Sequence, residues 1–341
     1  MSSVVELTRA LVRIPSESGH EEECVALLAD RLRARVVGRN VIAVRGDGPR
    51  SLLLNSHTDT VPASDDWNLD PYEAELRDGK VYGLGANDAK GPLAALVIAF
   101  ETAEIPADAR LVLAATCEEE TGGAGLGTIL KELPRFDASI VGEPTFLTVC
   151  SCQRGLLRLR LTARGKSAHA SRPWQGENAI EKAARDVEAL RRLPLADAHP
   201  LLGPPTLQVT MIQGGVRTNV VPPLCRMEID ARTIPALDNA TLHRRVRDAV
   251  ESDVELVSER FVPVETATAE PIVQAALAAT GASEPGAFGG VSDLYHVRDV
   301  PGIVMGPGRS EQSHAADEWI EVDQLERGVQ AYRETIERYF A

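Results

Sequence analysis

In the segment SLLLNSHTDTVP, residues 51–62, an apolar run is followed closely by a histidine and an aspartate. A short apolar run bounded by polar residues is typical of a buried strand. His57 and Asp59 therefore stand where this strand is expected to end. Because two ligand-type side chains lie at the end of one strand, we next consider which other candidate ligands the chain places near them.

The neighbouring segments predict the sheet to which this strand belongs. Further strands are expected at RLVLAAT (110–116) and ASIVGEP (138–144), with helices that begin near Lys90 and Thr121 between them. Other helices are expected at 3–14, 21–34 and 322–340. Strands that alternate with helices predict an α/β domain with a mixed, mostly parallel sheet that is flanked by helices.

The pattern changes from about Arg154. GLLRLRLTARG (155–165) alternates strictly between leucine and mainly arginine, as in a strand with one solvated face. The next segments predict a helix, two strands, a helix and a strand, at 177–193, 206–212, 224–232, 242–250 and 254–262. The apolar stripe expected on the first of these helices is Ile180, Ala184, Val187 and Leu190.

This order of elements, β-α-β-β-α-β, is the ferredoxin-like arrangement. We therefore expect an α+β domain of residues 154–263, inserted into a catalytic domain that is formed by residues 1–153 and 264–341.

The composition limits the classes of partner. The 341 residues carry a net charge of −14, which argues against nucleic acid or an anionic membrane surface. No secretory signal is visible, and the longest apolar run, at 91–100, is shorter than the ~20 residues of a membrane helix. The five cysteines show no C-x-x-C spacing, which favours a reduced, cytoplasmic protein.

Ligand-type residues lie at the ends of the predicted strands of the first domain or in the loops that follow. They are His57 and Asp59, Asp88, Glu118 to Glu120, Glu143 and His314. Each alone has an ordinary explanation, because carboxylates are favoured in the first turn of a helix and loop histidines are common. Open α/β sheets build their sites at the carboxyl ends of strands. Two histidines and several carboxylates, without thiolates, predict an open catalytic site for two zinc ions, which cobalt or manganese can replace.

These residues lie in motifs that resemble those of a known family. The motifs are NSHTDTVP (55–62), YGLGANDAKG (82–91), TCEEETGG (116–123), VGEPT (141–145) and GPGRSEQSHAADEW (306–319), with GKSAHASRPWQGENAI (165–180), GGVRTNVVPP (214–223) and DART (230–233) in the inserted domain. Their order and context are similar to those of the dinuclear zinc amidohydrolases. That family includes acetylornithine deacetylase, succinyl-diaminopimelate desuccinylase, the aminoacylases and carboxypeptidase G2. The resemblance covers essentially the whole chain.

The resemblance implies a role for each matching residue. The implied metal ligands are His57 with Glu143 on one zinc, His314 with Glu120 on the other, and Asp88 as the bridge between them. Glu119 would be the general base, and Asp59 would orient the His57 ring. The family order makes Glu118 the leading acidic residue of the triple glutamate, and a frame shifted by one residue is the alternative.

The inserted domain would contribute through a dimer. In the family, a histidine from the inserted domain of the partner subunit helps to bind the oxyanion, and His169 matches it. Asn219 and Arg232 match residues that hold the α-carboxylate of the substrate, although Arg232 also suits an exposed strand position. The resemblance therefore implies a homodimer through the inserted domain.

The residues of the motifs most resemble those of acetylornithine deacetylase. Glu143 favours deacylases over the aminopeptidase branch of the family, which tends to have aspartate at this position. The implied reaction is hydrolysis of N-acetylornithine to ornithine and acetate, a step of arginine biosynthesis. N-succinylornithine, N-succinyl-diaminopimelate, N-acetylcitrulline and dipeptides remain alternative substrates, and a catalytically silent binding protein is a further alternative. The sequence departs from the family at Val291, where threonine is common, and at Ala89, where methionine is frequent.

Overall fold

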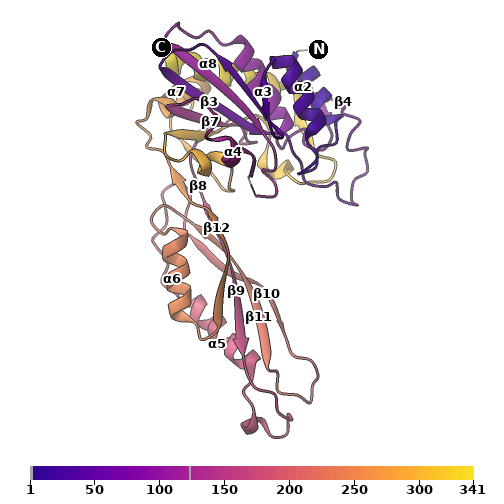
Figure 1. Cartoon of the computed structure of the whole chain (residues 1–341), viewed down its shortest axis with the longest axis vertical. Coiled ribbons are helices and arrows are strands. Elements are labelled where there is room, and N and C mark those ends of the chain that lie inside the picture. The colour runs from indigo at the N-terminus through magenta and orange to yellow at the C-terminus, as the bar shows by residue number, and fades with distance from the viewer. Residues whose placement is uncertain (1–2, 123) are drawn as a thin grey trace. The chain divides into compact units, whose positions relative to one another are not determined.

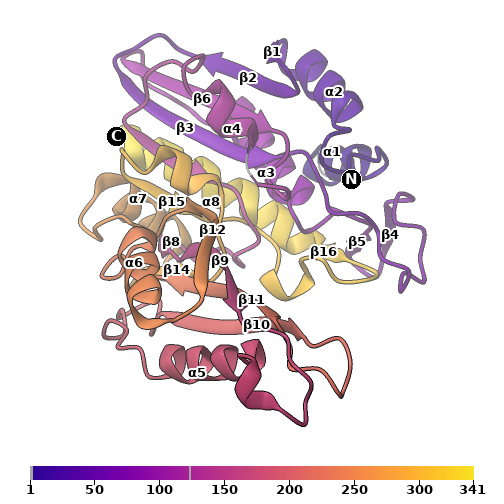
Figure 2. The ribbon, with the colours of Figure 1, turned by 60° about the horizontal axis from the view of Figure 1, so that its bottom comes forward.

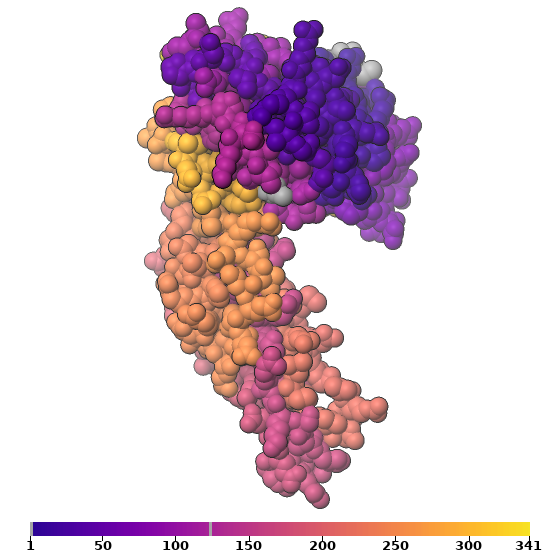
Figure 3. Space-filling model, viewed as in Figure 1, coloured from indigo at the N-terminus to yellow at the C-terminus, as the bar shows by residue number. Residues whose placement is uncertain are grey.

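The computed structural model describes residues 3–122 and 124–341 (Figure 1). The chain divides into two compact units, which can be followed by colour in Figures 1 and 3. The first unit comprises the chain up to Cys152, together with Thr266–Phe288 and Ser292–Ala341. The second unit comprises Gln153–Glu265 and Gly289–Val291. Each unit is described by itself below.

The first unit is built on a large mixed sheet. Its strands, in spatial order, are β1 (Arg35–Val37), β2 (Asn40–Arg45), β6 (Ala109–Thr116), β3 (Arg50–His57), β7 (Ala138–Val141), β15 (Gly302–Val304) and β8 (Cys150–Gln153), and β14 (Gly286–Phe288) pairs with β8. β3 lies between β6 and β7 and runs parallel to both, and β15 is parallel to β7. β2 and β8 join this parallel centre in antiparallel orientation. The expected mixed, partly parallel sheet is confirmed.

Helices flank this sheet. They are α1 (Ser3–Val12), α2 (Glu22–Leu32), α3 (Lys90–Thr102), α4 (Ala124–Ile129), α7 (Pro271–Thr280) and α8 (Val322–Phe340). α3 is buried from Lys90 to Phe100, because it packs against β3 and is in turn contacted by α1 and α8. α8 lies beside α7 (Figure 2). Within the described residues, no helix combines the length and the apolar character needed to cross a membrane.

A small antiparallel sheet stands apart from the large one. It consists of β16 (Trp319–Glu321), β5 (Lys80–Tyr82) and β4 (Glu75–Arg77). β5 pairs with β16, so that Trp319 lies opposite Tyr82. This pairing joins the segment before Asp88 to the segment after His314, which are far apart in the sequence.

The second unit has the order β9 (Gly155–Arg164), α5 (Ala179–Arg191), β10 (Thr206–Gly214), β11 (Leu224–Thr233), α6 (Asn239–Ala249) and β12 (Asp253–Phe261). Its antiparallel sheet has the spatial order β10-β11-β9-β12, which is the ferredoxin-like topology. The leucines of β9 are buried, and its Arg158 is exposed. The alternation of this strand therefore predicts its solvated face correctly.

Two local predictions are wrong. The helix expected near Thr121 begins at Ala124, because Glu119 and Gly122 form a turn in which Gly122 N donates to Glu119 O at 3.1 Å. The stripe expected on α5 is also misplaced. The side chains that α5 buries are Ala179, Ala183, Asp186 and Leu190, while Ile180 and Ala184 are exposed. Asp186 belongs to the buried face because its carboxylate accepts hydrogen bonds from Glu251 N at 2.8 Å and Ser252 N at 3.1 Å.

Candidate metal centre

The parallel strands of the first unit carry the candidate ligands to one edge of the large sheet. His57 is the last residue of β3, and Glu119 and Glu120 follow the end of β6. Glu143 follows β7, and Asp88 comes just before α3. Because parallel strands present their carboxyl ends at the same edge, the segments that carry these residues are brought to one edge of the sheet.

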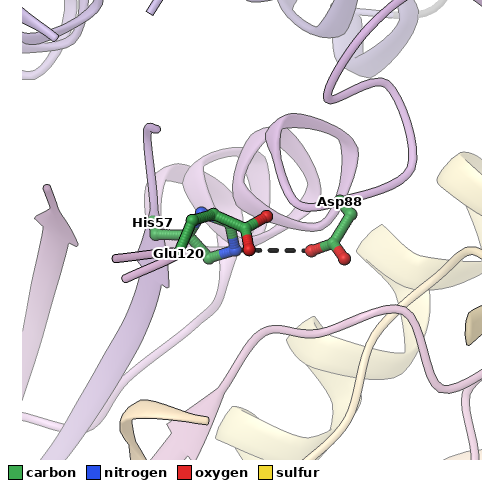
Figure 4. A group of neighbouring side chains, drawn as sticks. All are labelled: His57, Asp88 and Glu120. Atoms are coloured by element: carbon green, nitrogen blue, oxygen red, sulfur yellow. Dashed lines mark ion pairs between the residues drawn. The ribbon is translucent and has the colours of Figure 1, made fainter. Parts of the chain in front are cut away.

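Asp88 lies between the two histidines. His57 Nε2 is 3.4 Å from Asp88 Oδ1, and His314 Nε2 is 3.9 Å from Asp88 Oδ2. His314 Nε2 is also 2.9 Å and 3.0 Å from the two carboxylate oxygens of Glu120. Ligand atoms of His57, Asp88 and Glu120 all lie within 4.8 Å of one another, and Figure 4 shows these side chains pointing toward a common centre. This group could hold a metal ion.

The ring of His57 is oriented by Asp59. Nδ1 of His57 lies 3.0 Å from the backbone oxygen of Asp59 and 3.4 Å from Asp59 Oδ1. A proton on Nδ1 satisfies these oxygens and leaves Nε2 free to bind a metal beside Asp88. Burial lowers the pKa of His57, but hydrogen bonds to Asp59 and Asp88 outweigh it and raise that pKa well above its usual value in the metal-free protein.

Asp59 also fixes the loop of glutamates. Its fully buried carboxylate accepts hydrogen bonds from Glu119 N and Glu120 N, each at 3.1 Å, and from Ser18 Oγ at 2.6 Å. One carboxylate thus holds the end of β3 and the loop after β6 together. This second role of Asp59 was not predicted from the sequence.

Glu118 is directed to a different set of partners. It pairs with Arg39, whose Nε is 2.6 Å from the buried Glu21 carboxylate. Glu21 in turn accepts hydrogen bonds from Gly19 N at 2.8 Å and Glu118 N at 3.2 Å. Glu118 adopts a left-handed backbone conformation with a φ of 56°. The structure therefore brings Glu120 to His57 and Asp88, and Glu118 to Arg39.

Burial and mutual repulsion act on the carboxyl groups at this edge. Burial, followed by the charge of Glu143, raises the pKa of Glu119 well above its usual range. Burial also raises the pKa of Glu143, with further contributions from Asp88 and Glu120. A cluster of buried carboxylates is costly without compensating positive charge. The donor set of imidazole nitrogens and carboxylate oxygens therefore fits divalent metal ions.

Several residues of this region were missed by the sequence reasoning. Asp293 is buried, accepts a hydrogen bond from Thr116 Oγ at 3.1 Å, and has a pKa raised by burial to about 6. Glu318 and Arg39 each fix a loop that carries a candidate ligand or base. The only sequence signal for Glu318 was its place in the motif GPGRSEQSHAADEW, whereas Arg39 had no local signal.

The second unit carries the three remaining candidates. Ala170 N donates to Asn219 O at 2.9 Å, which brings the segments of His169 and Asn219 together. His169 is exposed, and its Nδ1 lies 2.8 Å from Ser171 Oγ. Arg232 of β11 is paired with Asp230, whose Oδ1 is 2.8 Å from Arg232 Nε. Part of the hydrogen-bonding capacity of Arg232 is therefore used within its own strand.

Comparison with known proteins agrees with this architecture. An aminopeptidase PepT from Bacillus cereus matches with a TM-score of 0.80 and 21% identity, over 99% of this chain and 98% of that one. An M20 family metallo-carboxypeptidase from Sulfolobus solfataricus matches with a TM-score of 0.78 and 17% identity, over 99% of both chains. A protein from Bacillus subtilis, described as a dinuclear metal binding peptidase of the M20 family, matches with a TM-score of 0.72 and 17% identity, over 98% and 96%.

The sequence model of one family matches most of the chain. It is described as peptidase family M20/M25/M40 and matches residues 53–338, a range that contains every candidate metal ligand. The resemblance noted in the sequence motifs is thereby confirmed. The chain belongs to the peptidase family M20/M25/M40.

Proposed function

We propose that this protein hydrolyses the amide bond of an N-acyl amino acid with the help of two divalent metal ions. The observation that carries the proposal is the meeting of His57, Asp88 and Glu120, with His314 against Glu120. His57 and Glu143 would hold one ion, His314 and Glu120 the other, with Asp88 between them. Zinc suits these donors, and cobalt or manganese can take its place.

When bound, such a pair of ions supplies Lewis acidity and lowers the pKa of a bound water toward neutrality. In this proposal, the carboxylate of Glu119 transfers a proton. Its raised pKa suits a carboxylate that accepts a proton from the attacking water and returns it to the leaving amine. Asp59 supports this role because it holds the backbone of Glu119 and the ring of His57 at the same time.

The substrate proposed is N-acetylornithine, which would be converted to ornithine and acetate in arginine biosynthesis. The wording of the motifs and the glutamate at position 143 support a deacylase. Peptides are the second candidate, because the structural neighbours include an aminopeptidase, a tripeptidase and a dipeptidase. N-succinylornithine, N-succinyl-diaminopimelate and N-acetylcitrulline are the other acyl amino acids to be compared.

We further propose a cytoplasmic homodimer that associates through the second unit. β10 is the edge strand of the sheet in that unit, and Met211 and Ile212 on it are 66% and 57% exposed. An edge strand with exposed apolar side chains favours pairing with another chain. In such a dimer, His169 of one protomer would help to bind the oxyanion at the site of its partner, and Asn219 and Arg232 would contact the α-carboxylate of the substrate. All five cysteines are free and buried, in keeping with a reducing compartment.

The test is a release assay on zinc- or cobalt-loaded protein with N-acetylornithine, the three other acyl amino acids named above and a dipeptide. We compare Glu119→Gln, Glu120→Gln and Glu118→Gln with the wild type. Glu119→Gln is expected to keep metal affinity and to lose about 10²- to 10⁴-fold in kcat, because a general base contributes about that much. Glu120→Gln is expected to lose metal affinity.

The outcomes separate the alternatives. A loss of kcat in Glu118→Gln, with a loss of metal affinity in Glu119→Gln and wild-type metal affinity in Glu120→Gln, would show that the frame of the triple glutamate is shifted by one residue. If only the dipeptide is turned over, the protein is a dipeptidase and the proposed deacylase activity is wrong. If the protein binds two metal ions but turns over none of these compounds, the proposed hydrolytic activity is refuted and a catalytically silent binding protein is favoured.

A further inference from the structure

Glu318 is a buried carboxylate that belongs neither to the metal ligands nor to the proposed base. It lies directly before β16, and 1% of it is exposed. Its position in the sequence is close to His314, but its partners lie in the loop before α3. That loop carries Asp88, the residue between the two histidines.

All the hydrogen bonds described for the Glu318 carboxylate come from backbone N–H groups of this loop. Oε1 accepts from Asn87 N at 2.7 Å and from Asp88 N at 2.9 Å, and Oε2 accepts from Gly85 N at 2.9 Å. The backbone oxygen of Glu318 also accepts from Gly83 N at 2.9 Å. The loop is therefore folded around one side chain, and its last bond is to Asp88 itself.

The loop is shaped to reach this carboxylate. Gly85 has a φ of 78°, and a Cβ there would approach Thr60 Cγ2 to 2.7 Å. A glycine adopts this left-handed conformation without strain and leaves room for the close approach. The N–H groups of residues 85, 87 and 88 can then converge on a single acceptor group, as in an anion-binding loop of backbone amides.

A second hydrogen-bonded contact joins the Asp88 loop to the chain on the N-terminal side of His314. The side chain of Asn87 accepts a hydrogen bond from Arg309 N at 2.7 Å and donates one to Arg309 O at 3.0 Å. The segment from Arg309 to Glu318 is thus attached to the Asp88 loop at both of its ends, and His314 lies between the two attachments. The relative position of Asp88 and His314 depends on these ties.

We propose that Glu318 is a positioning residue that holds Asp88 and His314 in register for the metal pair. This inference rests on the metal site of the proposed function. A carboxylate is needed because three N–H donors are shared between its two oxygens. A glutamine offers one acceptor oxygen, and its NH₂ group would face at least one of the N–H donors. Loss of such an outer partner typically lowers metal affinity by about 10- to 100-fold.

The matched pair of variants is Glu318→Gln and Asp317→Asn. Asp317 is the neighbouring residue, and its carboxylate also accepts from backbone N–H groups, those of Asn68 and Leu69, each at 2.9 Å. It has no described contact with Asp88. Asp317→Asn therefore tests the effect of removing a carboxylate charge from the same segment at a residue that is not connected to the metal ligands.

The experiment measures Zn²⁺ and Co²⁺ affinity by competition with a chromophoric chelator, the visible spectrum of the Co²⁺-loaded full-length protein, and thermal unfolding of the metal-free protein. Glu318→Gln is expected to bind metal about 10- to 100-fold more weakly and to change the Co²⁺ spectrum. Asp317→Asn is expected to keep both the affinity and the spectrum of the wild type. Equal affinities and spectra in the two variants would overturn the inference while leaving the proposed metal site intact.

If Glu318→Gln does not fold, Asn87→Ala provides a second test of whether these hydrogen bonds position Asp88 relative to His314. It removes the tie to Arg309 and should also weaken metal binding, by about tenfold. An unchanged affinity in Asn87→Ala would then overturn the inference. Failure of the wild type to bind two ions would refute the proposed function, and this inference with it.

Discussion

Asp59→Asn is the most informative single change at the metal centre, because this carboxylate connects a candidate ligand to the loop of the proposed base. It is fully buried and accepts hydrogen bonds from Glu119 N, Glu120 N and Ser18 Oγ. It also lies beside Nδ1 of His57. Asparagine preserves the shape but removes the charge and replaces one acceptor oxygen by a donor.

The size of the effect follows from the lost acceptor. Whichever way the amide is oriented, either Glu119 N or Glu120 N faces an NH₂ group in place of an oxygen. A buried donor left without an acceptor costs about 1–3 kcal/mol. Since about 1.4 kcal/mol corresponds to a factor of ten, we expect metal affinity, kcat or both to fall by about 10- to 100-fold.

The assay combines metal titration of the metal-free protein with kcat measured at saturating metal. Asp137→Asn is the control, because Asp137 accepts from Ser51 N at 2.9 Å and Ser51 Oγ at 3.0 Å at the other end of β3. The control should alter stability slightly and leave metal affinity and kcat unchanged. Wild-type affinity and kcat in Asp59→Asn would refute the reasoning that this carboxylate holds both elements.

Three further predictions concern the surroundings of the site and the second unit. Arg39→Met removes the partner of Glu118, so we expect a lower kcat with metal affinity nearly unchanged, and a melting temperature below that of the wild type; unchanged kcat would show that the pairing does not position the loop. His314 has a pKa raised to about 9 by its hydrogen bond to Glu120, and the pKa of His57 is also raised by its hydrogen bonds to Asp59 and Asp88, so a metal ion has to displace protons when it binds these rings. Metal binding should therefore release protons, and affinity should increase as the pH rises from 7 toward 9, which calorimetry in buffers of different ionisation enthalpy measures; no buffer dependence would contradict this. Ile212→Lys places a charge on the edge strand β10 and should convert the proposed dimer to a monomer in light scattering, whereas a dimer that persists would move the interface elsewhere.

Some features of the fold and site were readable because they have local signals. The apolar run before His57 predicts β3, and the alternation of β9 predicts its exposed arginines. Residues that follow strands were expected to meet at one edge because parallel strands end there. Ligand atoms of His57, Asp88 and Glu120 do lie within 4.8 Å of one another.

Other features depend on contacts that no local pattern records. The stripe of α5 was misplaced because Asp186 is buried by hydrogen bonds to residues beyond α6. Arg39 lies in a short turn between β1 and β2, and only the folded sheet brings it to Glu118. Glu318 resembles an ordinary acidic residue of a loop until the backbone of the Asp88 loop is placed around it.

The discontinuity of the first unit has a consequence for how the site matures during synthesis. His57, Asp88, Glu120 and Glu143 precede the second unit in the chain, and His314 follows it. A ribosome therefore releases four of the five candidate ligands, and then the whole of Gln153–Glu265, before the last ligand and α8 appear. The second unit has its own sheet and can fold as a unit in the meantime. The candidate metal centre can therefore be completed only after His314 has been synthesised and has reached the sheet formed by the earlier strands.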